Sequence, residues 1–134
     1  MSIYNTIRGA LDSKLASVSG LPDVAYANIP YQEDPNTPFI RANLTPVSRR
    51  PEVIGYNPSQ RYQGLYSIVI CVPENQGAGT AYTYADTIVN AFDATTDISF
   101  GGEVVSVDYS EVGTPYYDSP FYLVPVTVGW HTYN

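Results

Sequence analysis

The sequence predicts an α+β domain in which a mainly antiparallel β-sheet carries two α-helices on one face. Two segments repeat apolar residues at helical spacing, and several others alternate between apolar and polar residues as strands do. The strands also come in neighbouring groups, without the regular βαβ alternation of a parallel sheet. With 134 residues, 44% of them hydrophobic, the chain fits a single domain, residues 1–134, with a core of ordinary size.

The first part of the chain is expected to form one helix and two strands. Residues 3–18 predict an amphipathic helix, with Ser2 placed to cap its first turn and Ser19-Gly20 near its end. A short strand is expected over residues 23–28, followed by a polar loop with three prolines. The alternation over residues 39–45 then indicates a half-buried strand.

Residues 46–61 contain three prolines and no sustained apolar period, so they predict a long loop. Structureless loops of this length are uncommon in compact domains, which makes the segment either functional or ordered only by a partner. A partner could bury its apolar side chains and pair its arginines with carboxylates. The contact candidates are Arg49, Arg50, Val53, Ile54, Tyr56 and Arg61.

The second half is expected to begin with a central strand over residues 62–72 that ends at Pro73. A helix starting near Gly77 or Thr80 has one apolar stripe. That stripe consists of Ala81, Ala85, Ile88, Val89 and Phe92. Strands around residues 98–100 and 103–109 flank a Gly101-Gly102 turn.

The C-terminal part is expected to contain an aromatic loop and one long strand. The loop covers residues 113–120 and carries Tyr116 and Tyr117, two further candidates for protein contact. Residues 121–133 alternate as a strand should, with Trp130 on the more apolar face. Pro125 lacks a backbone donor and therefore favours an edge or bulged position in this strand.

Thirteen tyrosines against a single lysine, Lys14, indicate a surface that other proteins cover. Interface cores enrich Tyr and Arg and deplete Lys, because a rigid ring loses little entropy while an ammonium group must lose tightly held water. Five of the six cationic residues are arginines. We therefore expect a subunit of an assembly first, and a tyrosine-lined cleft for a small ligand such as a sugar second.

The charge balance limits the partners. Only 14% of residues are charged, the formal net charge is −7 and the pI is near 4.3. Static nucleic-acid binding needs cations, so it is disfavoured, whereas a surface past which DNA slides remains compatible. No secretory signal or membrane-length apolar run is present in the sequence, and the default expectation is folding in a reducing cytoplasm, with no membrane partner.

No residue pattern predicts catalysis, a cofactor or a metal. The glycines of Gly77-Ala78-Gly79 lie too far from the preceding strand for a dinucleotide fingerprint, so we interpret them as a helix entry. His131 and Cys71 are each expected to be structural, and the lone cysteine excludes an intrachain disulfide. Glu103, Asp108 and Glu111 could form a glycosidase-like pair, but a solvated acidic face is favoured.

The arginine cluster of residues 49–61 holds half of the cations of the chain. It could contact a protein, contact a nucleic acid, or merely be solvated, and protein contact is favoured. The concentration of cations in an acidic protein suggests a partner rich in carboxylates, including another copy of the chain.

Three segments resemble the small tail terminator-like proteins of long-tailed bacteriophages. They are the N-terminal helix, the strand from Pro38 to Leu44, and the stretch from Val72 to Phe92. In that stretch a strand ends at Pro73, a glycine pair follows, and a helix carries Ala85-Asp86 and then Phe92. Length and element order match over nearly the whole chain.

The resemblance implies a virion structural protein without catalysis. Such a protein forms a hexameric ring at the head-proximal end of the tail tube, stops tube polymerisation and meets the head connector or stopper protein. Viral DNA would pass through its channel without specific binding. Alternatives are another neck subunit, a hydrolase built on scattered carboxylates, or a carbohydrate-binding module that stacks sugars on Tyr116, Tyr117, Tyr122 and Trp130.

Overall fold

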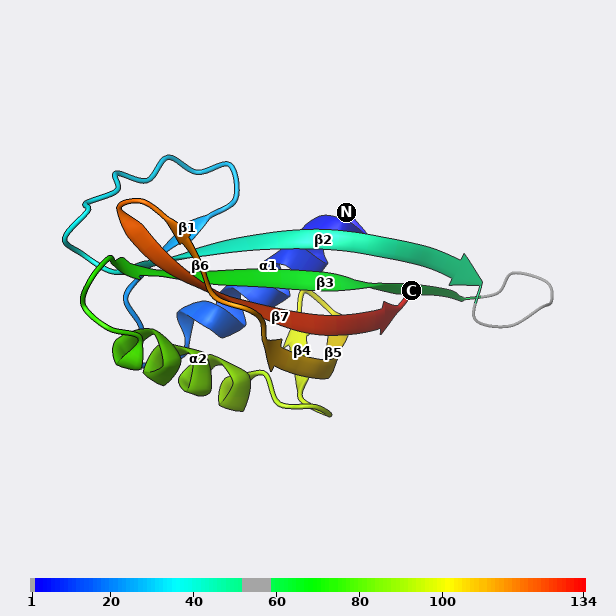
Figure 1. Cartoon of the computed structure of the whole chain (residues 1–134). Helices are drawn as coiled ribbons and strands as arrows, with labels where there is room; N and C mark the ends of the chain where they lie inside the picture. The colour runs from blue at the N-terminus through cyan, green and yellow to red at the C-terminus, as the bar shows by residue number, and fades with distance from the viewer. Residues whose placement is uncertain (1, 52–58) are drawn as a thin grey trace.

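The computed structural model describes residues 2–51 and 59–134, which form a twisted sheet and two helices (Figure 1). The helices are α1 (Ile3–Ala16) and α2 (Gly79–Ala91). The strands are β1 (Asp23–Tyr26), β2 (Phe39–Pro51), β3 (Gln60–Pro73), β4 (Asp97–Phe100), β5 (Glu103–Val112), β6 (Tyr116–Asp118) and β7 (Phe121–Tyr133). Their order in the sheet is β1-β2-β3-β7-β5-β4, and β6 also pairs with β7. Only the β1–β2 pair is parallel, so the predicted α+β class with a mainly antiparallel sheet is confirmed.

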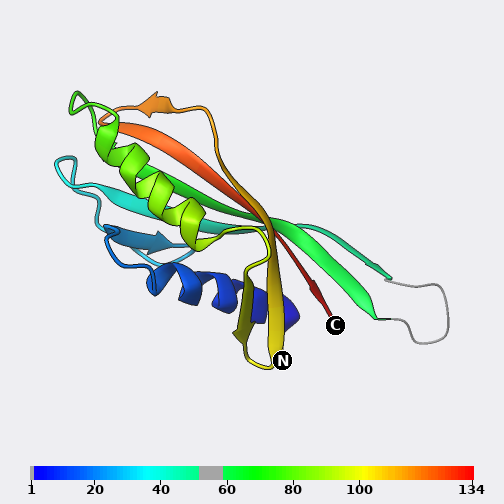
Figure 2. The same ribbon diagram turned by 90° about the horizontal axis from the view of Figure 1, so that it is seen from below.

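Both helices lie on one face of the curled sheet, as predicted. Figure 2 shows α2 in front of the central strands, whereas α1 lies further along the same face, in contact with β4 and β5. The main core lies between the two layers. From α2 and its C-cap residue it receives Ala81, Ala85, Ile88 and Phe92, all fully buried. This is the apolar stripe expected from the sequence, except that Val89 is only partly buried.

Strands β3 and β7 form the centre of the sheet and pair from Arg61–Tyr133 to Pro73–Phe121. Alternate residues of both strands face the helices. The buried ones include Tyr66, Ile68, Ile70, Val124, Val126, Val128 and Trp130. The predicted alternation of the last strand is therefore confirmed, and Trp130 is a fully buried core residue.

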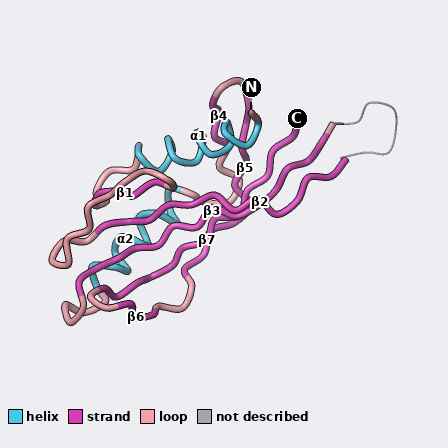
Figure 3. The backbone as a smooth tube through the Cα atoms, turned by 90° about the horizontal axis from the view of Figure 1, so that it is seen from above, coloured by secondary structure: helices cyan, strands magenta, loops and turns pink. Residues whose placement is uncertain are grey.

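The opposite face of the sheet carries a second, smaller cluster at one end. Phe39, Cys71, Phe121 and Leu123 are buried there. Tyr31, from the loop between β1 and β2, covers them and stacks on Phe39 with ring centroids 5.1 Å apart. We call the remainder of this face, which no helix covers, the free face (Figure 3).

Local sequence sets several element boundaries. The Ser2 hydroxyl accepts a hydrogen bond from the Asn5 amide at 3.2 Å and so caps α1, as expected. Gly101 and Gly102 both have positive φ, 59° and 83°, which is the backbone of a tight two-residue hairpin turn. Side chains other than glycine or asparagine would be strained there, so the Gly-Gly pair fixes the β4–β5 hairpin.

The predicted loop over residues 46–61 is wrong at both of its ends. Strand β2 continues through Pro46 to Pro51, and β3 already begins at Gln60. Strand β1 covers β2 only as far as Ala42, so the later residues lie at the sheet edge, where a missing proline donor is tolerated. Pro46 pairs with Gly64 and Ser48 with Gln63, so the register shift between them leaves Val47 as the extra residue of a bulge beside the first proline.

Two expectations near the C-terminus also need correction. Residues 116–118 of the predicted loop form strand β6, which pairs with β7. Strand β7 is central, so Pro125 does not lie on an edge strand. Its position falls between the segments of β7 that pair with β5 and β6, and its carbonyl accepts a hydrogen bond from Gly113 at 2.8 Å. Because neither β5 nor β6 pairs with β7 at Pro125, no hydrogen bond of the sheet is lost through its missing N–H group.

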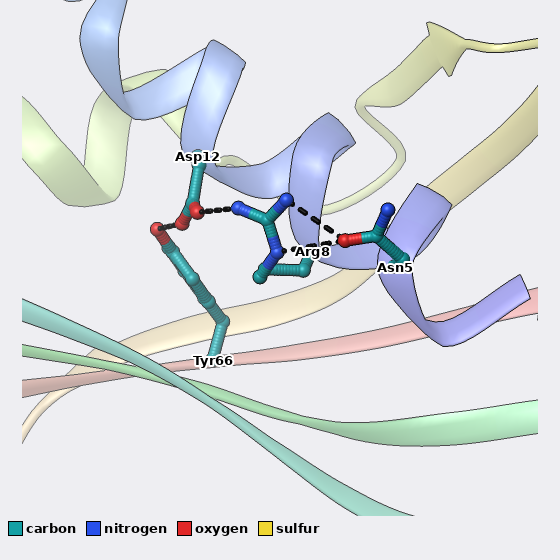
Figure 4. Close-up of polar contacts among 4 residues, drawn as sticks. All are labelled: Asn5, Arg8, Asp12 and Tyr66. Carbon is teal, nitrogen blue, oxygen red and sulfur yellow. Dashed lines mark hydrogen bonds and ion pairs between the residues drawn. The ribbon is translucent and has the colours of Figure 1, made fainter. Parts of the chain in front are cut away.

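A polar chain ties α1 to the sheet (Figure 4). The hydroxyl of Tyr66, a fully buried residue of β3, donates to the Asp12 carboxylate. Asp12 also accepts from Arg8 at 2.9 Å, and Arg8 in turn donates to the side chain of Asn5 at 2.9 and 3.2 Å. Burial, with Asp12 beside it, raises the pKa of Tyr66, so the phenol remains a donor throughout the physiological range.

Replacement of Phe92 by alanine should lower the free energy of unfolding by about 3 to 5 kcal/mol, because it empties a fully enclosed site. Asp86→Ala, on the exposed side of α2, should cost far less. Urea melts of both variants measure the difference. Equal losses would show that α2 packs through another face.

The Tyr66→Phe variant should lower the free energy of unfolding by roughly 1.5 to 3 kcal/mol, the range for a hydrogen bond to a charged group. Tyr26 is a suitable control, because it lies near the same carboxylate and makes no side-chain hydrogen bond to a described residue. Tyr26→Phe should therefore be nearly neutral in the same urea melts. If Tyr66→Phe were neutral too, the bond to Asp12 would contribute nothing to stability.

Candidate assembly surfaces

The arginines that are close in sequence lie on two different faces of the β2–β3 hairpin. Arg49 lies opposite Tyr62 in the register, on the helix side of the sheet. Its Nε donates to the Tyr62 hydroxyl at 3.0 Å, and its guanidinium lies over that ring, 5.6 Å from the centroid. Tyr62 also meets Tyr4 of α1 edge to face at 5.4 Å. These contacts hold the base of the hairpin against α1.

Arg50 and Arg61 pair with each other in the register and face the opposite side, because side chains alternate along a strand. They border a shallow concavity of about 550 Å³ together with Gln63 and Tyr133. Arg61 donates to the Gln63 side chain. Two guanidinium groups thus lie on the free face near the end of the sheet. We call residues 48–51 and 60–63 the hairpin arm.

The tyrosine candidates lie far from the hairpin arm. Strand β6 is near one end of the sheet, and the hairpin extends from the other (Figure 3). Tyr117 is 71% exposed and meets Tyr122 edge to face at 5.1 Å, whereas Tyr116 faces the other side of the strand. Val53, Ile54 and Tyr56 lie outside the described residues. The predicted contact residues therefore form at least three separate surfaces.

Further apolar side chains of β4 and β5 are exposed, and sequence reasoning missed them. Phe100 and Val112 lie on the helix side and Val104 and Tyr109 on the free face, and each is 37% to 48% exposed. The Tyr109 ring covers Gly129 so closely that a Cβ there would lie 2.2 Å from it. The sequence does contain a signal for the exposure of Val104. Side chains alternate along β5, so Val104 lies on the side of the sheet away from buried Val105 and Val107.

Charge is also unevenly distributed over the sheet. Every lysine and arginine of the chain precedes residue 62. From Tyr62 onward the carboxylates are Glu74, Asp86, Asp93, Asp97, Glu103, Asp108, Glu111 and Asp118. Four of these eight lie on β4 and β5, which we call the acidic edge: Asp97, Glu103, Asp108 and Glu111. The sheet order separates the acidic edge from β2 by β3 and β7.

Ser106, His131 and Glu103 each form a side-chain hydrogen bond with a described residue. His131 Nδ1 lies 2.5 Å from Asp108 Oδ1, an orienting carboxylate that the sequence could not identify. Ser106 faces His131 in the register, but its hydroxyl donates to Asp97 at 2.8 Å, away from the imidazole. Glu103 accepts from Asn134 at 2.7 Å. These contacts do not constitute a nucleophile–base pair or a carboxylate pair.

The concavity that the structure describes beside the glycine stretch is small. The glycine stretch before α2 borders a cavity of about 150 Å³ beside Tyr117 and Tyr122, and burial is the main cause that raises the pKa of Tyr122. Within the described ranges, no three His, Cys, Asp or Glu side chains could together hold a metal ion. Neither described helix is long and apolar enough to cross a membrane.

The carbohydrate-stacking hypothesis does not fit the placement of its residues. Trp130 is fully buried, and Tyr116 and Tyr117 point to opposite sides of β6. A stacking platform needs exposed rings on one surface. The four residues proposed for that role therefore do not form a common platform.

The described residues form an α+β domain with several separate exposed surfaces. The chain belongs to the phage tail terminator family, because the family model described as "Phage tail terminator protein" matches residues 2–130. This match confirms the resemblance drawn from the sequence and identifies a structural component of the phage tail. A search of the curated proteins found no match.

Comparison with solved structures supports the fold. One solved structure, whose name states no function, has a TM-score of 0.75 to this chain. It is 22% identical, and the match covers 98% of this chain and 96% of that chain. At this identity the likeness shows the shared fold alone.

The thiol of Cys71 should be unreactive in the folded protein. It is fully buried, and burial raises its pKa to about 11, so little thiolate forms near neutral pH. A water-soluble disulfide reagent should label it at pH 7.5 only after urea is added. Rapid stoichiometric labelling of the native protein would show that the cluster around Phe39 opens readily.

Proposed function

We propose that this protein forms a hexameric ring at the head-proximal end of the tail tube, stops tube polymerisation and joins the finished tail to the head connector or stopper protein. The observation that carries the proposal is the family match over residues 2–130. A ring in that position has neighbours on both sides, a tube below and a connector above. The chain, as a single domain of residues 1–134, would supply separate surfaces for these contacts.

The distribution of exposed residues supports several simultaneous protein contacts. Aromatic and apolar side chains are exposed at β6, along β4–β5 and, as Val47 and Tyr133, beside the hairpin arm. Tyr and Arg are favoured at interfaces because they give large contact area with a small entropic loss. We propose Arg49, Arg50, Arg61, Tyr116 and Tyr117 as protein-contact residues, together with Val53, Ile54 and Tyr56 of the connecting segment.

The net charge of −7 supports the passage of viral DNA through such a ring without specific binding. Phosphates are repelled by a predominantly acidic protein, and tight binding would require cations that displace counterions. We further propose that the ring assembles in the host cytoplasm without a cofactor and without catalysis.

Removal of the protein from an infection should give tail tubes of uncontrolled length that do not attach to heads, because the growing end is never closed. Electron microscopy of tubes from a knockout phage measures both properties, and expression of the intact chain in trans should restore them. Lys14→Glu provides a control variant that should also restore them. Knockout tubes of normal length would contradict the role in termination.

A further inference from the structure

The hairpin arm holds most of the cations that are free of described carboxylates. Arg8 forms an ion pair with Asp12 at 2.9 Å, and Arg41 forms one with Glu33 at 3.1 Å. No described carboxylate lies within ion-pair distance of Arg49, Arg50 or Arg61. The remaining cation, Lys14, lies on α1. The arm is therefore the main positive surface of the described chain.

The complementary surface is the acidic edge. Its carboxylates lie on the last two strands of the sheet order, and no lysine or arginine belongs to the same half of the sequence. Asp97 and Glu111 are exposed and have no cationic partner among the described residues. A guanidinium from another molecule could approach either carboxylate without displacing an existing ion pair.

Exposed apolar groups accompany the charges on both surfaces. Val47 is 59% exposed and Tyr133 is 44% exposed beside the arm. Val104 and Tyr109 are exposed along the acidic edge on the free face, whereas Phe100 lies on the helix side, over Gly9 of α1. A patch with apolar side chains and a charged surround is the composition of a protein interface, in which the charges set partner and orientation.

The arm is also held in place before any contact is made. Arg49, on its helix side, is bonded to Tyr62, and Tyr62 packs against Tyr4 of α1. This arrangement leaves Arg50 and Arg61 directed away from the helices on a supported strand pair. Preorganisation of this kind reduces the entropy lost on binding.

From these observations we propose that the hairpin arm of one subunit docks on the acidic edge of the next copy of the chain. The two surfaces are different and lie on opposite edges of one sheet, so the contact is head to tail and repeats from subunit to subunit. Such a contact closes into a ring when the rotation between neighbours permits it. The inference rests on the proposed ring and identifies the surfaces that form it.

A second copy fits the arm better than DNA does. The residues from Tyr62 to Asn134 contain eight carboxylates and no lysine or arginine, so a phosphate backbone that reached Arg61 would approach an extensive negative surface. A neighbouring copy presents Asp97 and Glu111 at one defined edge, and neither has a cationic partner among the described residues. The tail tube protein is the other partner that could bind the arm, and the rescue experiment distinguishes it from a second copy of the chain.

Two charge-reversed variants test the contact. The arm variant carries Arg50→Glu with Arg61→Glu, and the edge variant carries Asp97→Lys with Glu111→Lys. We choose a concentration at which the unmodified protein forms rings, in the presence of tube ends if these are needed. Neither variant should form rings alone under the same conditions. An equal mixture should recover rings, because acidic arms then meet basic edges and basic arms meet acidic edges in alternation. Native mass spectrometry measures ring mass and the one-to-one composition.

Matched controls show whether an assembly defect arises from the altered surface or only from the altered net charge. Asp23→Lys with Asp86→Lys makes the same change of net charge as the edge variant at exposed positions elsewhere, and it should assemble normally. Lys14→Glu should likewise assemble, whereas Arg50→Glu alone should weaken the ring. Circular dichroism melts confirm that each variant folds.

The outcomes distinguish this interface from the proposed function. Normal rings from either charge-reversed variant alone would overturn the interface and leave the ring intact. An arm variant that loses tube capping and is not rescued in the mixture would assign the arm to the tube protein and overturn the inference. Unmodified protein that stays monomeric even beside tube ends would overturn the proposed function and the interface together.

Discussion

The long antiparallel pairing of β3 with β7 is the constraint on which the rest of the structure depends. It joins the middle of the chain to its C-terminal segment and sets the register that places Tyr66, Val128 and Trp130 on the helix side. Because side chains alternate along a strand, a slip of one residue would exchange the two faces of the sheet. Both cores, the tie from Tyr66 to Asp12 and the direction of every arm residue follow from that register.

Patterns that are local in the sequence predicted most of the fold. The stripes of α1 and α2, the cap at Ser2 and the Gly101-Gly102 turn each depend on residues a few positions apart, and each was confirmed. Residues 46–51 were misjudged because their strand is defined by hydrogen bonds to β3, after a bulge that hides the alternation. Residues 116–118 likewise become a strand only through pairing with β7.

The candidate surfaces were harder to predict, because a surface is assembled from strands that are distant in sequence. Arg49 and Arg50 are adjacent residues, yet the pleat of β2 directs them to opposite sides of the sheet. The bond between His131 and Asp108 spans two strands and has no local signature. The absence of lysine and arginine after Arg61 was visible in the sequence. Only the strand order shows that it places the arginines of β2 and β3 towards one edge of the sheet and the carboxylates of β4 and β5 at the other.

The same distribution of cations determines how a protease could dissect the molecule. Trypsin cuts after lysine and arginine, so even complete digestion leaves residues 62–134 as one polypeptide. That fragment contains α2, β7 and nearly all of β3, including the Tyr66 phenol that holds α1. The cleavable bonds therefore lie in the N-terminal helix, in β2 and at the second residue of β3, and the stretch from Tyr62 onward, which includes all of β7, offers trypsin no site.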